Sequence, residues 1–159
     1  MLMATRGPAY LRLGLSEQPA WLSAEPYAPW RRILPGRGAT VVFAGPLAGQ
    51  AVDAIRCSGL PSDVWLVSEL PAVEFPPEFI ASIRDAQFLM VIEEHVTNGG
   101  FGQALARDLM CAGVQPRRFV HRAALGYPSG LYGSQTFHRA ESGLDPASIV
   151  AELARAVAP

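Results

Sequence analysis

The stretch FLMVIEEHVTNGGFGQAL, residues 88–105, decides how the rest of the sequence is interpreted. It begins with a continuous apolar run, which is typical of a strand buried on both faces. Two glutamates and a histidine follow the run, and a glycine cluster then opens into apolar residues at helical spacing. The stretch therefore predicts a strand followed directly by a helix, which is the repeating unit of a parallel α/β sheet.

The same alternation recurs along the chain. The predicted strands are 39–45, 64–70, 88–94 and 117–123. Helical patterns separate them, and a closing helix follows Asp145, which is placed as its N-cap. The segment 31–34 is too close to the strand at 39–45 to be its parallel neighbour through a helix, so we expect it to be an antiparallel edge strand. The predicted fold class is α/β, with three α/β/α layers and a mixed, mostly parallel five-stranded sheet.

Composition excludes several classes of protein. The chain has 159 residues, 50% of them hydrophobic, and a net charge of −1. This hydrophobic fraction argues against a disordered protein, and the charge argues against a protein that binds nucleic acid or a membrane surface through a broad basic face. No apolar run approaches the roughly 20 residues that a membrane-spanning helix needs.

The two cysteines, Cys57 and Cys111, both fall in helical patterns. Because Arg6 and Arg12 interrupt the first apolar stretch, no secretory signal is visible. We therefore expect buried, reduced thiols and a cytoplasmic protein.

The N-terminal part differs from the rest. GPAYLRLGL, residues 7–15, can form one strand, but no helix accompanies it, and 16–30 is a proline-containing linker. Its tryptophans either pack back on the domain or face a partner. We predict a boundary between 1–30 and 31–159, and the candidate partner contacts are Tyr10, Arg12, Trp21 and Trp30.

The polar turn after the strand at 88–94 is the main candidate site. Consecutive side chains of a strand point to opposite faces, so either Glu93 or Glu94 can reach the crevice at the carboxyl end of the sheet. The glycines allow close approach to a helix N-terminus, where free N–H groups favour an anion. The candidate residues for this anion-binding or interface loop are Glu94, His95, Gly99, Gly100 and Gly102.

A purely structural turn is the alternative interpretation. Glycines before a helix often only permit tight packing, and GGFG is not the dinucleotide-binding fingerprint. The chain also has no phosphate-binding P-loop, no GxSxG nucleophile elbow and no Cys/His set with metal-ligand spacing.

Four further groups of residues have weaker signals. Arg117, Arg118 and Arg122 either form an anion patch or flank an edge strand, and we favour the edge strand. We expect His121 to be a hydrogen-bonded core histidine and His138 to lie in an exposed loop. Tyr127 and Tyr132 belong to a glycine-rich segment that is either a binding loop or a contact with a neighbour.

The order of these elements resembles the C-terminal domain of transketolase-like thiamine diphosphate enzymes, most closely split bacterial transketolases and 1-deoxyxylulose-5-phosphate synthases. The matching segments are GRGATVVFAGPLAGQAVDAI, VWLVSELP, FLMVIEEHVTNGGFGQALARDL and SGLDPASIVAEL. GPAYLRLG, residues 7–14, is similar to the last strand of the preceding pyrimidine-binding domain in that family. The resemblance covers nearly the whole chain.

The resemblance implies a subunit or domain that contributes assembly and dimer contacts. It implies no catalytic, cofactor or metal residue in this chain, and it assigns thiamine diphosphate and Mg²⁺ to a larger partner subunit. Some family members hold a substrate phosphate with an arginine after the last pyrimidine-domain strand, where this chain has Leu15.

Two alternatives stay open. One is a free-standing small-molecule module that binds an anion at the 99–102 helix end. The other, more distant, is a relative of the C-terminal domain of 2-oxoacid dehydrogenase β-subunits, which would meet an acyltransferase core.

Overall fold

The computed structural model describes residues 7–11, 18–23, 26–72 and 74–157. The strands in these ranges are β1 (Trp30–Leu34), β2 (Ala39–Ala44), β3 (Ser62–Val67), β4 (Phe88–Val96) and β5 (Arg118–Ala124). The helices are α1 (Ala48–Ser58), α2 (Pro77–Ala86), α3 (Phe101–Cys111), α4 (Gln135–Glu141) and α5 (Pro146–Val157). None of the helices in the described ranges is long and apolar enough to cross a membrane.

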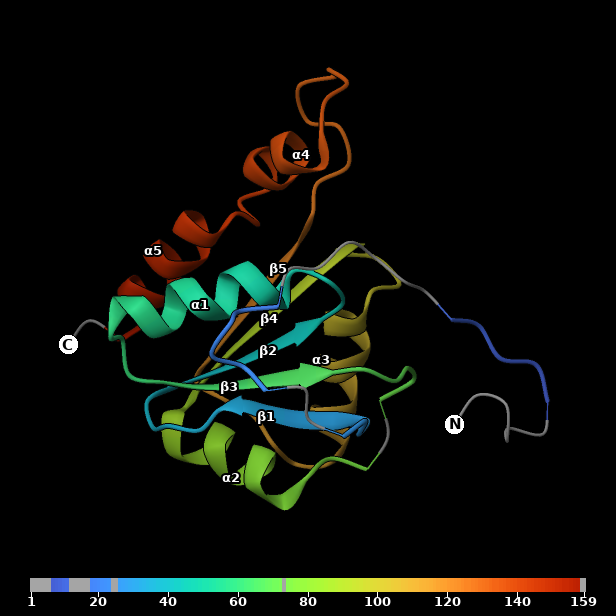
Figure 1. Cartoon of the computed structure of the whole chain (residues 1–159). Coiled ribbons are helices and arrows are strands. Elements are labelled where there is room, and N and C mark those ends of the chain that lie inside the picture. The colour runs from blue at the N-terminus through green and yellow to red at the C-terminus, as the bar shows by residue number, and fades with distance from the viewer. Residues whose placement is uncertain (1–6, 12–17, 24–25, 73, 158–159) are drawn as a thin grey trace.

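The five strands form one sheet in the order β1-β3-β2-β4-β5. β2 runs parallel to both β3 and β4, and β4 runs parallel to β5. β1 lies at one edge and is antiparallel to β3. Helices α1 and α5 cover one face and α2 and α3 cover the other (Figure 1). The predicted three-layer fold with a mostly parallel sheet and one antiparallel edge strand is confirmed.

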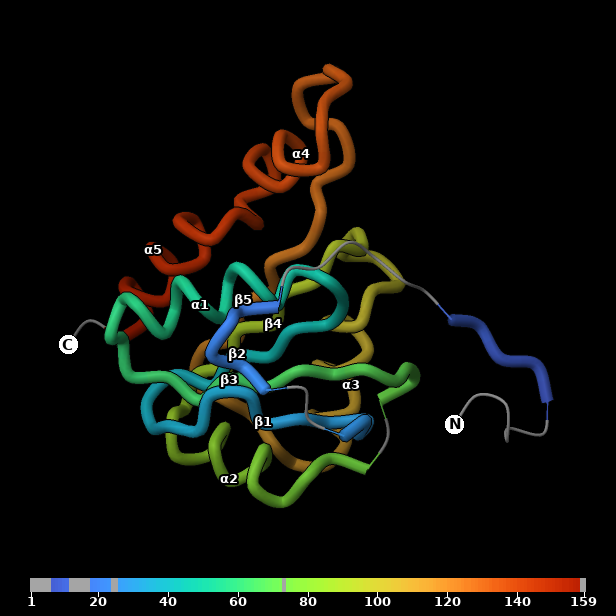
Figure 2. Tube along the Cα trace, in the orientation of Figure 1, coloured from blue at the N-terminus to red at the C-terminus, as the bar shows by residue number. Residues whose placement is uncertain are grey.

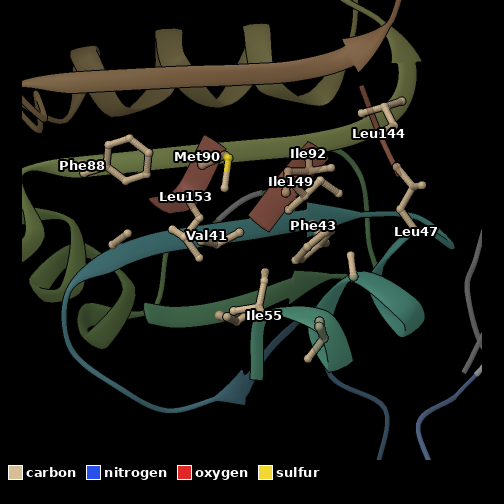
Figure 3. Close-up of a cluster of buried hydrophobic side chains, with 14 residues drawn as sticks. Val41, Phe43, Leu47, Ile55, Phe88, Met90, Ile92, Leu144, Ile149 and Leu153 are labelled. Carbon is tan, nitrogen blue, oxygen red and sulfur yellow. The ribbon is translucent and has the colours of Figure 1, made fainter. Parts of the chain in front are cut away.

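Consecutive residues of β2 point into two different cores. Val41 and Phe43 pack in one cluster with Ile55 of α1 and Leu153 of α5 (Figure 3). Val42 belongs to the cluster that lies under α2 and α3. All six residues of β2 are buried, and a strand covered on both faces has no need of a polar face. This double burial explains why the central strands have continuous apolar sequences.

β3 begins at Ser62 and ends at Val67, whereas the sequence predicts a strand over 64–70. Asp63 is 1% exposed, and its carboxylate accepts hydrogen bonds from Arg32 Nε and Trp65 Nε1, both at 2.7 Å. The N–H of Gly36 donates to the same carboxylate at 3.1 Å. Because these partners compensate the burial of charge, β3 includes a polar residue that an apolar pattern does not reveal.

The prediction of an exposed loop around His138 is wrong, because this residue lies in α4 and its side chain is 26% exposed. The helix begins after Ser134, whose hydroxyl oxygen accepts a hydrogen bond from the N–H of Phe137 at 3.1 Å. With seven residues, α4 is too short for a recognisable apolar stripe.

The N-terminal tryptophans pack on the domain, which is one of the two alternatives for them. The indole N–H of Trp21 donates to Asp53 of α1 at 2.7 Å, and Trp30 opens β1 with its ring 4.7 Å from that of Phe79. Residues 7–11 have no regular secondary structure, extend away from the sheet and leave Tyr10 87% exposed (Figure 2). Arg12 lies outside the described residues.

Both cysteines are free, but the predicted burial of their thiols is wrong, because Cys57 and Cys111 are exposed. α1 buries Ile55 and α3 buries Leu109. Each cysteine follows its buried residue by two positions, which is about 200° around a helix. The cysteines therefore lie on the outward faces.

We expect Ile55→Ala to lower the free energy of unfolding by roughly 2–5 kcal/mol, because Ile55 is fully buried between α1 and the sheet. The matched control is Met110→Ala on α3, where the side chain is 63% exposed and the expected change is within about 0.5 kcal/mol. Urea unfolding measures both, and similar losses for the two variants would contradict this description of the core.

Candidate functional site

Glu93 is the centre of the predicted site. It lies near the carboxyl end of β4, is 3% exposed, and points toward the N-terminus of α3. Its carboxylate accepts hydrogen bonds from the N–H of Phe101 and the N–H of Gly102, both at 2.8 Å. His121 Nε2, from the neighbouring strand β5, contacts Glu93 Oε1 at 2.7 Å. A single side chain thus joins β4, α3 and β5.

The chemistry of this contact fixes the roles of the two groups. Burial opposes ionisation of Glu93, but the hydrogen bonds from His121, Gly102 and Phe101 outweigh it and hold the pKa of the carboxyl below its usual range. An ionised carboxylate can only accept hydrogen bonds, so we assign the hydrogen of the His121 ring to Nε2. The prediction that His121 is a hydrogen-bonded core histidine is confirmed.

Three glycines shape this turn for different reasons. A Cβ on Gly100 would lie 2.5 Å from Glu93 Oε1 and 2.7 Å from the carbonyl oxygen of Val96. A Cβ on Gly102 would lie 2.4 Å from His121 Nε2. Gly99 instead has φ +77°, in the left-handed region, and open space around it. Thus 100 and 102 are glycine for lack of room, and 99 is glycine for backbone conformation.

The N-terminus of α3 already holds an anion, which is the carboxylate of Glu93. The N–H groups of Phe101 and Gly102 both donate to it, and Gly99 N–H donates to Gln103 Oε1 at 2.7 Å. These donors are the ones that an external anion at the 99–102 turn would need. Because protein acceptors already use these donors, the turn as folded leaves them no room for an external anion.

Glu94 points to the opposite face of the sheet. Its Oε1 accepts a hydrogen bond from Arg139 Nε at 2.7 Å and one from Gln135 Nε2 at 3.1 Å. Both partners belong to α4, and the Glu94 side chain is 14% exposed. The ion pair therefore attaches α4 to the end of β4.

His95 is exposed, and its Nδ1 contacts the carbonyl oxygen of Val96 at 2.8 Å. Among the described residues, the contacts of Glu94 and His95 lead to different groups, so the two side chains do not form a hydrogen-bonded acid/base pair.

Glu93 was not among the predicted site residues, yet the sequence contains a signal for it. Side chains in a strand alternate, so Glu93 shares a face with Leu89 and Val91, which are buried in the cluster that includes Phe101 of α3. A carboxylate on that face, eight residues before a helix with glycines at its start, predicts capping of the helix by the preceding strand.

The structure also places the other predicted residues. β5 is an edge strand, as expected, but Arg118 and Arg122 lie within it and do not flank it, and Arg117 directly precedes it. Both Arg118 and Arg122 pair with Glu152 of α5. Tyr127 lies between β5 and α4, with its ring 6.0 Å from that of Tyr132 and 5.1 Å from that of His138.

No group of three or more His, Cys, Asp or Glu side chains that could hold a metal ion occurs in the described part of the chain. The two glutamates at the end of β4 instead accept hydrogen bonds from protein donors. Glu93 bonds to the start of α3 and to His121, and Glu94 bonds to α4.

Several solved structures and a curated protein are similar to this chain, and no family model matches it. A split-gene transketolase, solved as an inactive β4 tetramer, aligns over 95% of this chain with a TM-score of 0.71 and 25% identity. Transketolase from Leishmania mexicana aligns over 82% of the chain with a TM-score of 0.50 and 18% identity, which concerns the fold alone. The transketolase family protein y4mN of Sinorhizobium fredii is 26% identical over 125 residues, or 74% of the chain.

The chain spans only part of these proteins, namely 36% of the Sinorhizobium protein, 50% of the split-gene chain and 19% of the Leishmania chain. The similarities agree with the resemblance found in the sequence, and the domain is a transketolase-like C-terminal domain.

Gly100→Ala should destabilise the protein by roughly 1–3 kcal/mol, because the added methyl group would displace the Glu93 carboxylate or the Val96 carbonyl. Asn98→Ala, at an exposed position of the same turn, is the control and should change stability by less than about 0.5 kcal/mol. Thermal unfolding compares the two, and an unchanged midpoint for Gly100→Ala would show that the close approach is not required.

Glu93→Gln should cost about 3 kcal/mol at neutral pH, because it removes a buried charge that three donors stabilise. The pKa of Glu93 is lowered on folding, so its stabilising contribution is present above the unfolded pKa near 4.3 and is lost as the pH falls through the folded value. The difference between wild type and variant should therefore shrink below about pH 4.

The measurement is urea unfolding of wild type and Glu93→Gln at a series of pH values. Glu78→Gln, which changes an exposed carboxylate on α2, is the control. A difference between wild type and Glu93→Gln that stays constant from pH 7 to pH 3 would contradict the ionised state assigned to Glu93.

Proposed function

We propose that this chain is the C-terminal subunit or domain of a thiamine diphosphate-dependent enzyme of the transketolase type, and that it supplies assembly contacts and not the cofactor site. The transketolase-like fold and the similarity to a split-gene transketolase support this proposal. In this assembly, which we place in the cytoplasm, a larger partner subunit binds thiamine diphosphate and Mg²⁺ and carries out the ketol-transfer chemistry.

The N-terminal part fits a contact with that partner. We propose that 1–30 contains the last strand of a pyrimidine-binding domain followed by a linker, and that 31–159 is the C-terminal domain. In the described residues 7–11, Tyr10 is 87% and Leu11 is 59% exposed, and neither takes part in a strand pairing. A strand that completes the sheet of another domain would bury such side chains.

The observation that carries the proposal is the projecting segment 125–134 between β5 and α4, which we call the arm. It extends beyond the carboxyl end of the sheet, at the top of Figure 1. Leu125, Tyr127, Leu131 and Tyr132 are each at least 60% exposed. Four large apolar side chains within eight residues are unusual on a surface that remains in water, and such patches mark sites of protein association.

The arm is held at its C-terminal end by Glu94, near the carboxyl end of β4. Because Arg139 and Gln135 of α4 bond to Glu94, the C-terminal end of the arm is attached to the end of β4. His95 lies exposed near the carboxyl end of β4. We propose that Glu94 positions the arm for contact with the partner and that the exposed His95 lies at the same interface. In this proposal the two residues are not a catalytic acid and base.

The first test is purification of the tagged chain from its native cell. The isolated complex should contain thiamine diphosphate and catalyse ketol transfer, whereas the chain alone should do neither. Titration calorimetry on the chain alone gives the decisive result, because a magnesium-dependent micromolar affinity for thiamine diphosphate would overturn the proposal that another subunit holds the cofactor.

The double variant Tyr127→Ser/Tyr132→Ser should weaken assembly by roughly tenfold or more, because exposed aromatic residues are frequent hot spots of interfaces. The rate of the saturated complex should stay unchanged. Met110→Ser is the matched control, since it removes a 63% exposed apolar side chain from α3 and should leave assembly unaffected. A hundredfold lower rate at saturation with unchanged affinity would instead assign the arm to the chemistry.

A further inference from the structure

Three arginines converge on one carboxylate at the side of the domain formed by β5 and α5. Glu152 of α5 is 7% exposed, and its Oε1 accepts a hydrogen bond from Arg118 Nη2 at 2.9 Å. Its Oε2 is shared by Arg155 Nη2, at 2.7 Å, and by Arg122 Nη2. Burial opposes ionisation of Glu152, but the hydrogen bond and charge of Arg122 and the charges of the other two arginines hold its pKa below the usual range.

This cluster has more positive charge than its carboxylate can neutralise. Three guanidinium groups against one carboxylate leave a local charge of +2. Two of the cations bond to the same oxygen atom, so they are held close to each other and repel. Pairing Glu152 requires only one arginine, so attachment of α5 to β5 does not account for the other two.

The cluster also has hydrogen-bond donors to spare. The Nε of Arg122 is buried and has no acceptor among the described residues. The side chains of Arg122, Arg118 and Arg155 are 30%, 48% and 64% exposed, and no other carboxylate of the described residues pairs with them. Since β5 is an edge strand, nothing on its outer side belongs to the sheet.

We propose that Arg118, Arg122 and Arg155 form a binding site for the phosphate group of a small phosphomonoester. A phosphomonoester dianion matches the local charge of +2, and guanidinium groups bind phosphate oxygens through paired N–H donors. The site lies on the face covered by α1 and α5, whereas Glu93 and the glycine turn lie toward α3. It is therefore on the opposite face of the sheet from Glu93 and the glycine turn, and it includes no residue of the arm on which the assembly proposed above depends.

The test is a titration of the full chain with glycerol 3-phosphate at constant ionic strength, followed by NMR of the backbone amides. At pH 7.5 we expect saturable shifts confined to 118–122 and 152–155. The second pKa of a phosphomonoester is about 6, so at pH 5 the ligand is mainly a monoanion and the affinity should fall several-fold. Acetate at the same ionic strength should give no saturable response.

Arg118→Gln/Arg155→Gln should weaken the affinity at least tenfold while the fold is kept, because Glu152 retains Arg122. Arg155→Gln alone, at the most exposed of the three positions, provides a milder second variant. Arg37→Gln, which changes an exposed arginine between β1 and β2, is the matched control and should bind like wild type. Shifts that do not saturate, equal affinity for acetate, or unchanged affinity in the double variant would each overturn the proposal.

Discussion

The buried carboxylate of Glu93 constrains the rest of the functional region. An ionised group in a protein interior is tolerated only when donors replace the water that it loses. Here the donors come from the first residues of α3 and from His121 of β5, so the charge joins three elements that are separate in the sequence. Gly100 and Gly102 follow from the same constraint, because side chains at those positions would occupy the space of the carboxylate and of the histidine ring.

Side chains alternate along β4, so the neighbouring residues Glu93 and Glu94 lie on opposite faces of the sheet and have different partners. Glu93 points toward α3 and is satisfied within the domain, whereas Glu94 points the other way and attaches α4. The arm next to α4 has exposed apolar side chains, whereas the Glu94 carboxylate is bonded to α4 within the domain. Adjacent carboxylates, a histidine and a glycine-rich helix start first suggest catalysis. In the folded protein the two carboxylates instead hold α3 and α4 in place, and the proposed assembly surface depends on the position of α4.

Agreement between sequence and structure is best where burial follows a local period. The apolar runs of β2 and β4 identify central strands, and the stripes of α3 and α5 identify the helices that cover them. The differences occur where a remote partner decides the outcome. β3 includes Asp63 because Arg32 pairs with it, and α4 forms next to Glu94, which is 45 positions from Arg139. The cysteines differ for another reason, since the prediction rested on the usual burial of reduced thiols and not on their place two positions after Ile55 and Leu109.

The sequence by itself determined the layers of the domain, the parallel core strands and the antiparallel edge strand, because the spacing of apolar residues shows which faces are buried. The order of the sequence segments determined the resemblance to a transketolase C-terminal domain. Only the tertiary structure decided that Glu93 occupies the start of α3 and that three arginines surround Glu152. The physical reason is that hydrogen bonds and ion pairs act over about 3 Å. His121 is 28 residues from Glu93, and Arg118 is 34 residues from Glu152, so only the folded chain brings these groups within that distance.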